Sequence, residues 1–209
     1  MKTARATADP VLPSSGRDRR RRSGAVTPYD FRRPVKLSRE NARTLQIAFE
    51  TFARQAAIVL TSSMRSVCAV DLVDIEQRTY TEYVDSLPET THLTVFTIEP
   101  VQHKAVLELP VGVVMGCVDR LLGGPGPAAQ PDRSLTDLEE AVVSGVFGRL
   151  VNEVRYALST LVAVEPVIVG TEYSPQLAQI ANATDAMVVA RFAFRREDIE
   201  HPFTLAMSF

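Results

Sequence analysis

The chain has 209 residues, of which 45% are hydrophobic, and a formal net charge of −2. This length and composition give room for one domain of moderate size with a sizeable apolar core. No stretch approaches the roughly 20 apolar residues of a membrane span, and the N-terminus lacks the apolar segment of a secretion signal. These observations exclude a membrane-spanning class and predict a globular cytoplasmic protein.

Charge is distributed unevenly along the chain. Residues 1–33 hold nine basic and three acidic residues, whereas the remainder holds 14 basic and 22 acidic residues. Proline, serine and arginine dominate the first part, which has few large apolar residues, so we expect residues 1–28 to be disordered and residues 29–209 to form the domain. The arginine run 19–22 could bind nucleic acid or anionic lipid. A solvated tail is favoured and no nucleic-acid partner is expected, because no aromatic residue lies among the arginines to stack on bases.

The first half of the domain is predicted to open with a long amphipathic helix. Ser38 is a good N-cap, and apolar residues then recur at helical spacing over residues 38–64. Pro110 stands where proline fits best, at the start of a helix over residues 111–122. The elements predicted between these helices are a strand over 67–75, a short helix over 80–86, and strands over 93–98 and 105–109.

The second half repeats this order. Thr136 and Glu139 have the spacing of a capping box, and an apolar helix face follows them. Strands are predicted over 162–170, 187–194 and 203–207, with an irregular or short helical segment over 174–180. The two halves align at an offset of 98 residues, so the sequence predicts one α/β domain with pseudo-twofold symmetry, built from a duplicated α-β-β-β unit.

A glycine-proline loop, Gly123-Gly124-Pro125-Gly126, lies between the halves. One interpretation is a helix C-cap followed by a linker. Another is an exposed loop that lets a partner approach the backbone closely. A phosphate cradle is rejected, because no Gly-Lys-Ser/Thr follows and the loop comes after a helix. If the loop is exposed, we expect Gly124→Val to leave the fold with only a modest loss of stability.

Side chains capable of catalysis are sparse. His92 and His103 flank strands, where a surface position is expected, and no histidine lies beside an obvious nucleophile. Glu139, Glu140 and Glu153 are assigned to a solvated helix face.

A neighbouring acid and base, and two cysteines, are the other side chains that could form a site. Asp119 and Arg120 could form a surface ion pair that contributes little stability. Cys68 and Cys117 are expected to be buried, reduced thiols without metal-ligand spacing. The residues therefore predict no active site, no metal site and no cofactor.

Several separated motifs resemble the middle domain of the FliM family of flagellar motor switch proteins, over about residues 29–209. They occur in the family's order and spacing. The motifs are Tyr29-Asp30-Phe31, Leu37-Ser38, Phe52-Ala53-Arg54-Gln55, Tyr80-Thr81-Glu82-Tyr83, Ser86-Leu87-Pro88, the stretch from Asp119 to Gly126, and Glu172-Tyr173-Ser174-Pro175-Gln176.

The resemblance implies the three-layer α/β/α fold of the CheC, CheX and FliM group. It also implies a structural and signalling subunit of the cytoplasmic switch ring, at the inner-membrane face of the flagellar basal body, with FliG and neighbouring FliM subunits as partners. The subunit would help to set the direction of rotation in chemotaxis. In the family a Gly-Gly-x-Gly loop contacts FliG, which assigns FliG binding to a set of six residues, Asp119, Arg120, Gly123, Gly124, Pro125 and Gly126.

Three departures from the family pattern limit this transfer. Residues 1–28 show no acidic and apolar segment of the kind that captures phosphorylated CheY, so CheY binding by another surface stays open. The chain stops where a C-terminal domain that pairs with FliN would begin, which suggests a shortened chain or a divergent member. The usual Pro-Leu-Lys-Gly is replaced by Pro100-Val101-Gln102-His103, which a turn should tolerate.

The competing function is a CheY phosphatase of the CheC type on the same fold. That activity requires a helix-borne Glu-x-x-Asn, whose amide orients a water molecule. Here Glu50 is followed three residues later by Ala53, and Glu153 by Tyr156. With neither amide present, we expect no phosphatase activity, and Asn152 is the first substitute to consider.

Overall fold

The computed structural model describes residues 38–127, 129–197 and 199–208. They belong to one compact unit, Arg33–Phe209. The predicted N-terminal arm, residues 1–28, lies outside the described residues, so its disorder stays a prediction. In the part of the chain that is described, no helix combines the length and apolar character needed to cross a membrane.

Two long helices, α1 (Arg39–Met64) and α4 (Asp137–Leu158), begin at the predicted caps. The Asn41 amide donates to Ser38 Oγ at 3.1 Å. At α4 the Glu139 amide donates to Thr136 Oγ1 at 3.4 Å, and the Thr136 amide donates to the Glu139 carboxylate at 2.7 Å. These bonds satisfy amides that have no partner within the helix, which is why both helices start there.

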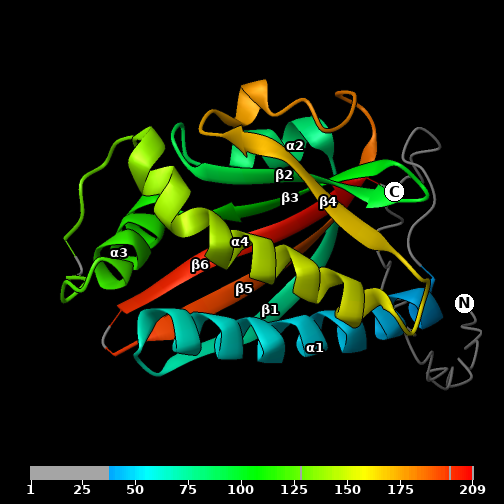
Figure 1. Ribbon diagram of the computed structural model, residues 1–209. Coiled ribbons are helices and arrows are strands. Elements are labelled where there is room, and N and C mark those ends of the chain that lie inside the picture. Colours follow the sequence, from blue (N-terminus) through cyan, green and yellow to red (C-terminus); the bar gives the residue numbers. More distant parts are fainter. Residues whose placement is uncertain (1–37, 128, 198, 209) are drawn as a thin grey trace, which may run out of the picture. The chain divides into compact units, whose positions relative to one another are not determined.

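Six strands form one sheet in the order β1-β5-β6-β3-β2-β4, and every neighbouring pair is antiparallel. The strands are β1 (Cys68–Thr79), β2 (His92–Glu99), β3 (His103–Leu109), β4 (Glu165–Glu172), β5 (Ala186–Arg196) and β6 (Ile199–Ser208). If the two halves are exchanged, β1 with β4, β2 with β5 and β3 with β6, the strand order is the same when it is read from the opposite edge of the sheet. The pseudo-twofold axis therefore passes between β3 and β6, and the predicted duplication is confirmed (Figure 1).

Each face of the sheet has its own apolar core. Helices α1, α4 and α3 (Val111–Leu121) contribute to the larger core, where the rings of Phe52 and Phe192 lie 5.3 Å apart. The opposite face is covered by α2 (Tyr80–Ser86) and by the segment around a short 3₁₀ helix, η1 (Pro175–Leu177), with Tyr83 and Ile180 in the smaller core. The predicted three-layer arrangement is confirmed, and its third layer is thin.

The largest differences from the predicted strand boundaries are at the end of β1, at the start of β4 and at the start of β6, which begins at Ile199 instead of residue 203. Strand β1 continues to Thr79 because β5 pairs with it over its whole length, which holds polar residues such as Gln77 in the sheet. Strand β4 begins at Glu165, since the Val162 amide still donates to the Leu158 carbonyl at 2.9 Å in a last turn after α4. At the β1 and β4 boundaries, hydrogen bonds determine the boundary more strongly than residue type does.

Candidate functional site

The candidate site is the loop over residues 122–127, at the C-terminal end of α3. The Leu122 amide donates to the Val118 carbonyl at 3.0 Å, and the Gly124 amide donates to the Asp119 carbonyl at 2.8 Å. Between them Gly123 has φ +95, a conformation that glycine adopts at little cost. The helix-stop interpretation of the glycines is therefore confirmed at Gly123.

Asp119 closes the loop on itself. Its Oδ2 accepts from the Gly126 amide at 2.5 Å. A Cβ atom added at Gly124 would overlap the Asp119 carboxyl group, so the close packing depends on a glycine there. The interpretation of Asp119 and Arg120 as a surface ion pair is wrong, because Asp119 binds the loop backbone and Arg120 pairs with Glu197 at 3.2 Å.

The end of β5 holds the loop from its other side. Arg196, which is 4% exposed, donates through Nη2 to the Gly126 carbonyl. Gly126 has φ +61, and a Cβ atom there would lie 2.7 Å from Arg196 Nη1 and 2.8 Å from Arg120 Cγ. Sequence reasoning missed Arg196, and only its place at the end of an apolar strand hinted that the guanidinium is buried.

The six predicted site residues lie together, but their exposure differs. Gly123 and Pro125 are exposed, Gly124 is half-buried and Gly126 is buried. Leu122, which the prediction did not include, is 67% exposed. The expectation of an exposed loop is confirmed for Gly123 and Pro125 and is wrong for Gly126. Gly124→Val would displace the Asp119 carboxyl group, and the expected modest effect on stability stays a prediction.

A second polar cluster lies at the start of β2, away from any predicted site. His92 is fully buried, stacks on Phe147 with ring centroids 4.3 Å apart, and has Nε2 3.3 Å from Glu140 Oε1. Tyr173 donates to the same Glu140 oxygen at 2.5 Å. Burial, with the Glu140 carboxylate, raises the pKa of Tyr173. The surface position expected for His92 is wrong, whereas His103 is exposed as predicted.

The two cysteines are buried free thiols, as predicted. Burial raises the pKa of Cys117 to about 12, so this thiol stays protonated and is a poor nucleophile. Among residues 38–127, 129–197 and 199–208, no group of three His, Cys, Asp or Glu side chains could hold a metal ion.

The helix positions that a CheC-type phosphatase would use carry no suitable pair. Ala53, three residues after Glu50 on α1, is buried, and Tyr156, three residues after Glu153 on α4, is 51% exposed. Asn152, the proposed substitute, precedes Glu153 directly. The absence of phosphatase activity stays a prediction, which decay of phosphorylated CheY with and without the chain would test.

Comparison with known sequences gives consistent matches. The family described as "Flagellar motor switch protein FliM" matches residues 38–209. A FliM from Treponema pallidum is 38% identical over 164 residues, which are 78% of this chain and 48% of the relative. A FliM from Borreliella burgdorferi is 32% identical over 176 residues, which are 84% of this chain and 50% of the relative. This chain thus spans about half the length of these relatives.

Solved structures agree with the fold. A structure described as a FliG–FliM complex from H. pylori matches with a TM-score of 0.78 and 25% identity, covering 82% of this chain and 94% of that chain. A FliM middle domain from Vibrio alginolyticus matches with a TM-score of 0.68 and 23% identity, covering 79% and 93%.

A FliY from Thermotoga maritima has a TM-score of 0.72 at only 14% identity, covering 83% and 92%, and shows the fold alone. The matched family is described as a motor switch protein, in agreement with the prediction that the chain is not an enzyme. From the family match over residues 38–209 and the sequence relatives, we conclude that this chain belongs to the flagellar motor switch protein FliM family.

Proposed function

We propose that this chain is a subunit of the flagellar motor switch and that it binds FliG through the loop over residues 122–127. The observation that carries the proposal is a loop whose conformation is held from beneath by Asp119 and Arg196, while Leu122 and Pro125 face outward. The match to the chain from the H. pylori FliG–FliM complex supports FliG as the partner.

The contacts inside the loop favour binding because they reduce the entropy lost when a partner docks. Because the loop is already ordered before binding, less of the favourable interaction energy is cancelled by lost conformational entropy, and the affinity is higher. In this proposal Leu122, Gly123 and Pro125 contact FliG, and Gly124 allows close approach of the backbone. Asp119, Arg120 and Gly126 contribute by fixing the conformation, through the contacts to Gly126 and Glu197.

The wider role proposed follows the family. The subunit would lie beside neighbouring FliM subunits in a ring at the cytoplasmic face of the inner membrane, and would help to set the direction of rotation. The proposal assigns no FliN contact to residues 38–209, because in the family that contact uses a separate C-terminal domain.

Hydrogen exchange of the chain with and without purified FliG tests the proposed surface. Binding should slow amide exchange at residues 122–127, because docking removes their backbone from water. The η1 segment on the opposite layer serves as the internal reference and should exchange at the same rate in both samples. Strong protection elsewhere, with residues 122–127 unchanged, would contradict the use of this loop even if FliG binds.

A further inference from the structure

Strand β4 forms one edge of the sheet, and β2 is the only described strand that pairs with it (Figure 1). Val167, Ile168 and Val169 follow one another in β4, and all three are exposed. No charged residue lies between Glu165 and Glu172. The free edge of such a strand carries backbone amides and carbonyls that can pair with another chain. Strand β4 is therefore suited to the addition of a further strand.

The opposite edge of the sheet, β1, is protected against such pairing. It carries Asp71, Asp74 and Glu76, which form ion pairs with arginines of β5. Charged side chains on an edge strand disfavour the approach of a second strand. The middle of β4 has no charged side chain, and Pro166 removes a backbone donor only near its start. The surface available for pairing is thus formed by residues 167–172.

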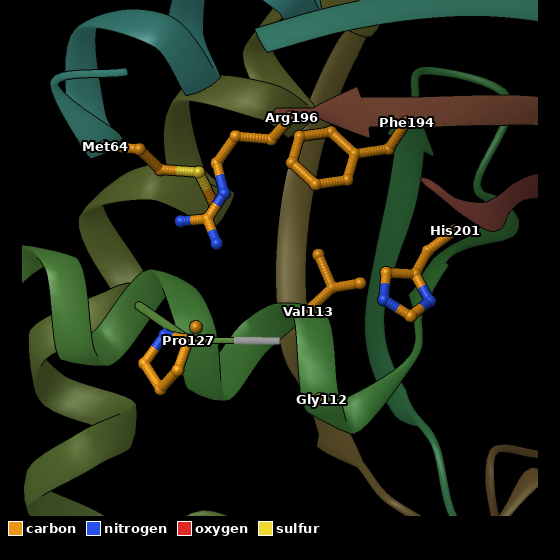
Figure 2. Close-up of a pocket in the computed structure, with 8 residues that line it drawn as sticks. Met64, Gly112, Val113, Pro127, Phe194, Arg196 and His201 are labelled. Carbon is orange, nitrogen blue, oxygen red and sulfur yellow. The ribbon is translucent and has the colours of Figure 1, made fainter. Parts of the chain in front are cut away.

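An open depression adjoins the start of β4. Its volume is about 540 Å³, and the apolar part of its wall comes from Pro100, Ala163 and Val164. Glu99 is among the carboxylates that line it. The cavity beside Arg196 that Figure 2 shows has a volume of only about 20 Å³, enough for one water molecule but not for a side chain. The depression suits a long basic side chain, whose aliphatic part would cover the apolar wall while its charge meets a carboxylate.

The charges around β4 indicate the kind of partner. Glu172 lies at one end of the strand, and Glu99, opposite Glu165 in the β2–β4 register, lies at the other. Glu165 pairs with Arg155 at 2.9 Å, whereas Glu99 and Glu172 take part in none of the ion pairs between described residues. Symmetric antiparallel pairing of two β4 strands would place Glu165 of each copy opposite Glu172 of the other. Like charges therefore disfavour a second copy, and the free carboxylates favour a basic partner.

We propose that β4 binds an extended segment of another protein, which pairs along the free edge at residues 167–172. The segment has an apolar centre and carries a lysine or arginine near each end. One basic side chain lies in the depression beside Glu99, and the other contacts Glu172. This surface shares no residue with the loop over residues 122–127, so the proposal does not rest on FliG binding.

The probe is a synthetic peptide with blocked ends, Lys-Thr-Val-Thr-Val-Thr-Val-Lys, and its control has glutamate in place of both lysines. Isothermal titration calorimetry with the whole chain should give at least tenfold tighter binding of the lysine peptide, and added salt should reduce the difference. A chain with both Glu99→Gln and Glu172→Gln should lose most of this preference. Bound lysine peptide should also slow hydrogen exchange at the β4 amides that face away from β2.

Two valines provide a matched pair of variants. Val169 on β4 and Val73 on β1 each lie at the bulge of an edge strand, and they are 62% and 59% exposed. Val169→Lys should weaken binding of the lysine peptide at least tenfold, because it adds a charge to the pairing surface. Val73→Lys should leave the affinity within about twofold. Both variants should keep the unfolding midpoint within about 2 °C of the parent, as expected for exposed positions.

Several results would overturn the proposal. They are failure of the lysine peptide to bind, equal binding of the two peptides, and equal weakening by Val169→Lys and Val73→Lys. Slow exchange of the outward-facing β4 amides in the free chain would also overturn it, since the edge would then be covered by this chain itself. A parent chain that self-associates in sedimentation, with Val169→Lys monomeric, would identify a second copy as the occupant and contradict the proposed basic partner.

Discussion

Gly126 is the residue on which the conformation of the loop depends most. It combines φ +61 with contacts on both sides, to Asp119 through its amide and to Arg196 through its carbonyl. Only a residue without a Cβ atom fits, because a Cβ atom at this position would lie 2.7 Å from Arg196 Nη1. A substitution at Gly126 is therefore expected to lower the stability of the fold and to alter the conformation of the loop surface.

Gly126→Ala should lower the free energy of unfolding by about 2–4 kcal/mol, from backbone strain together with overpacking. Gly145→Ala is the matched control, since Gly145 is exposed on α4 and has open space where a methyl group would be added. It should raise stability by about 0.5–1 kcal/mol, as expected for glycine in a helix. Urea unfolding measures both changes. Similar values for the two variants would contradict the packing described for Gly126.

Glu108 is a buried carboxyl group, 3% exposed, on β3. Its two oxygens accept from the Thr91 hydroxyl at 2.6 Å and the Thr204 hydroxyl at 3.0 Å. Burial raises the pKa of Glu108 above its usual 4.5, so the folded state holds the proton more tightly than the unfolded state. The resulting stability is present below pH 4.5 and is lost as the pH rises through the folded-state pKa.

Glu108→Gln should remove this pH dependence, because the amide is nearly isosteric and does not titrate. The free energy of unfolding of the parent minus that of the variant should fall as the pH is raised from 4.5 through the neutral range. Urea unfolding at successive pH values measures this difference. A difference that stays constant over this range would show that Glu108 titrates with the same pKa in the folded and unfolded states.

Residue-scale features of this kind are the hardest to predict from the sequence. His92 borders a strand, which predicts a surface position, yet Phe147 from α4 covers it. Arg196 and Gly126 are 70 residues apart and meet only in the folded chain. The sequence places Asp119 in the site, but its contact with the Gly126 amide depends on the path of the loop. In each case the partner is distant in sequence or depends on tertiary geometry.

At the scale of elements, α4 is stabilised by its N-terminal cap. Thr136 and Glu139 form the capping box, and the Arg133 guanidinium contacts the Glu139 carboxylate at 2.8 Å. The Arg133 contact, together with the Thr136 amide, lowers the pKa of Glu139 to about 2. Stability from the charged carboxylate is therefore present above pH 4.5 and is lost as the pH falls toward about 2.

Thr136→Ala should lower the free energy of unfolding by about 1 kcal/mol, since it removes an N-cap hydroxyl. Ser144→Ala, an exposed position within the same helix, should change it by less than about 0.5 kcal/mol. Urea unfolding near neutral pH measures both. Equal effects of the two variants would mean that the capping box contributes nothing beyond an ordinary surface hydroxyl.

Local signals of this kind explain why the order of elements can be predicted correctly. Ser38, Thr136 and Pro110 mark helix starts by chemistry that acts within one turn. Strand ends are predicted less well, because β1 is extended by pairing with β5 and β4 is shortened by the last turn after α4. A boundary set by a distant strand leaves little trace in the local pattern.

At the scale of the whole domain, the duplicated halves meet at the centre of the sheet, between β3 and β6. The loop after α3 follows the first half and contacts Arg196 of the second half, while Arg120 at the end of α3 pairs with Glu197. The repeat at an offset of 98 residues allows this architecture to be predicted from the sequence. The repeat carries no information about which parts of the loop are buried, because that depends on contacts between the halves.

The central claim is that the loop binds FliG, and the most direct test compares two leucines of similar exposure. Leu122 in the loop is 67% exposed, and Leu177 in η1, on the opposite layer, is 62% exposed. Leu122→Asp should weaken the affinity for purified FliG at least tenfold, or about 1.4 kcal/mol, when measured by isothermal titration calorimetry. Leu177→Asp should leave it within about twofold, and both variants should match the parent in unfolding to within about 0.5 kcal/mol. A folded Leu122→Asp chain that binds FliG as tightly as the parent would contradict the proposal.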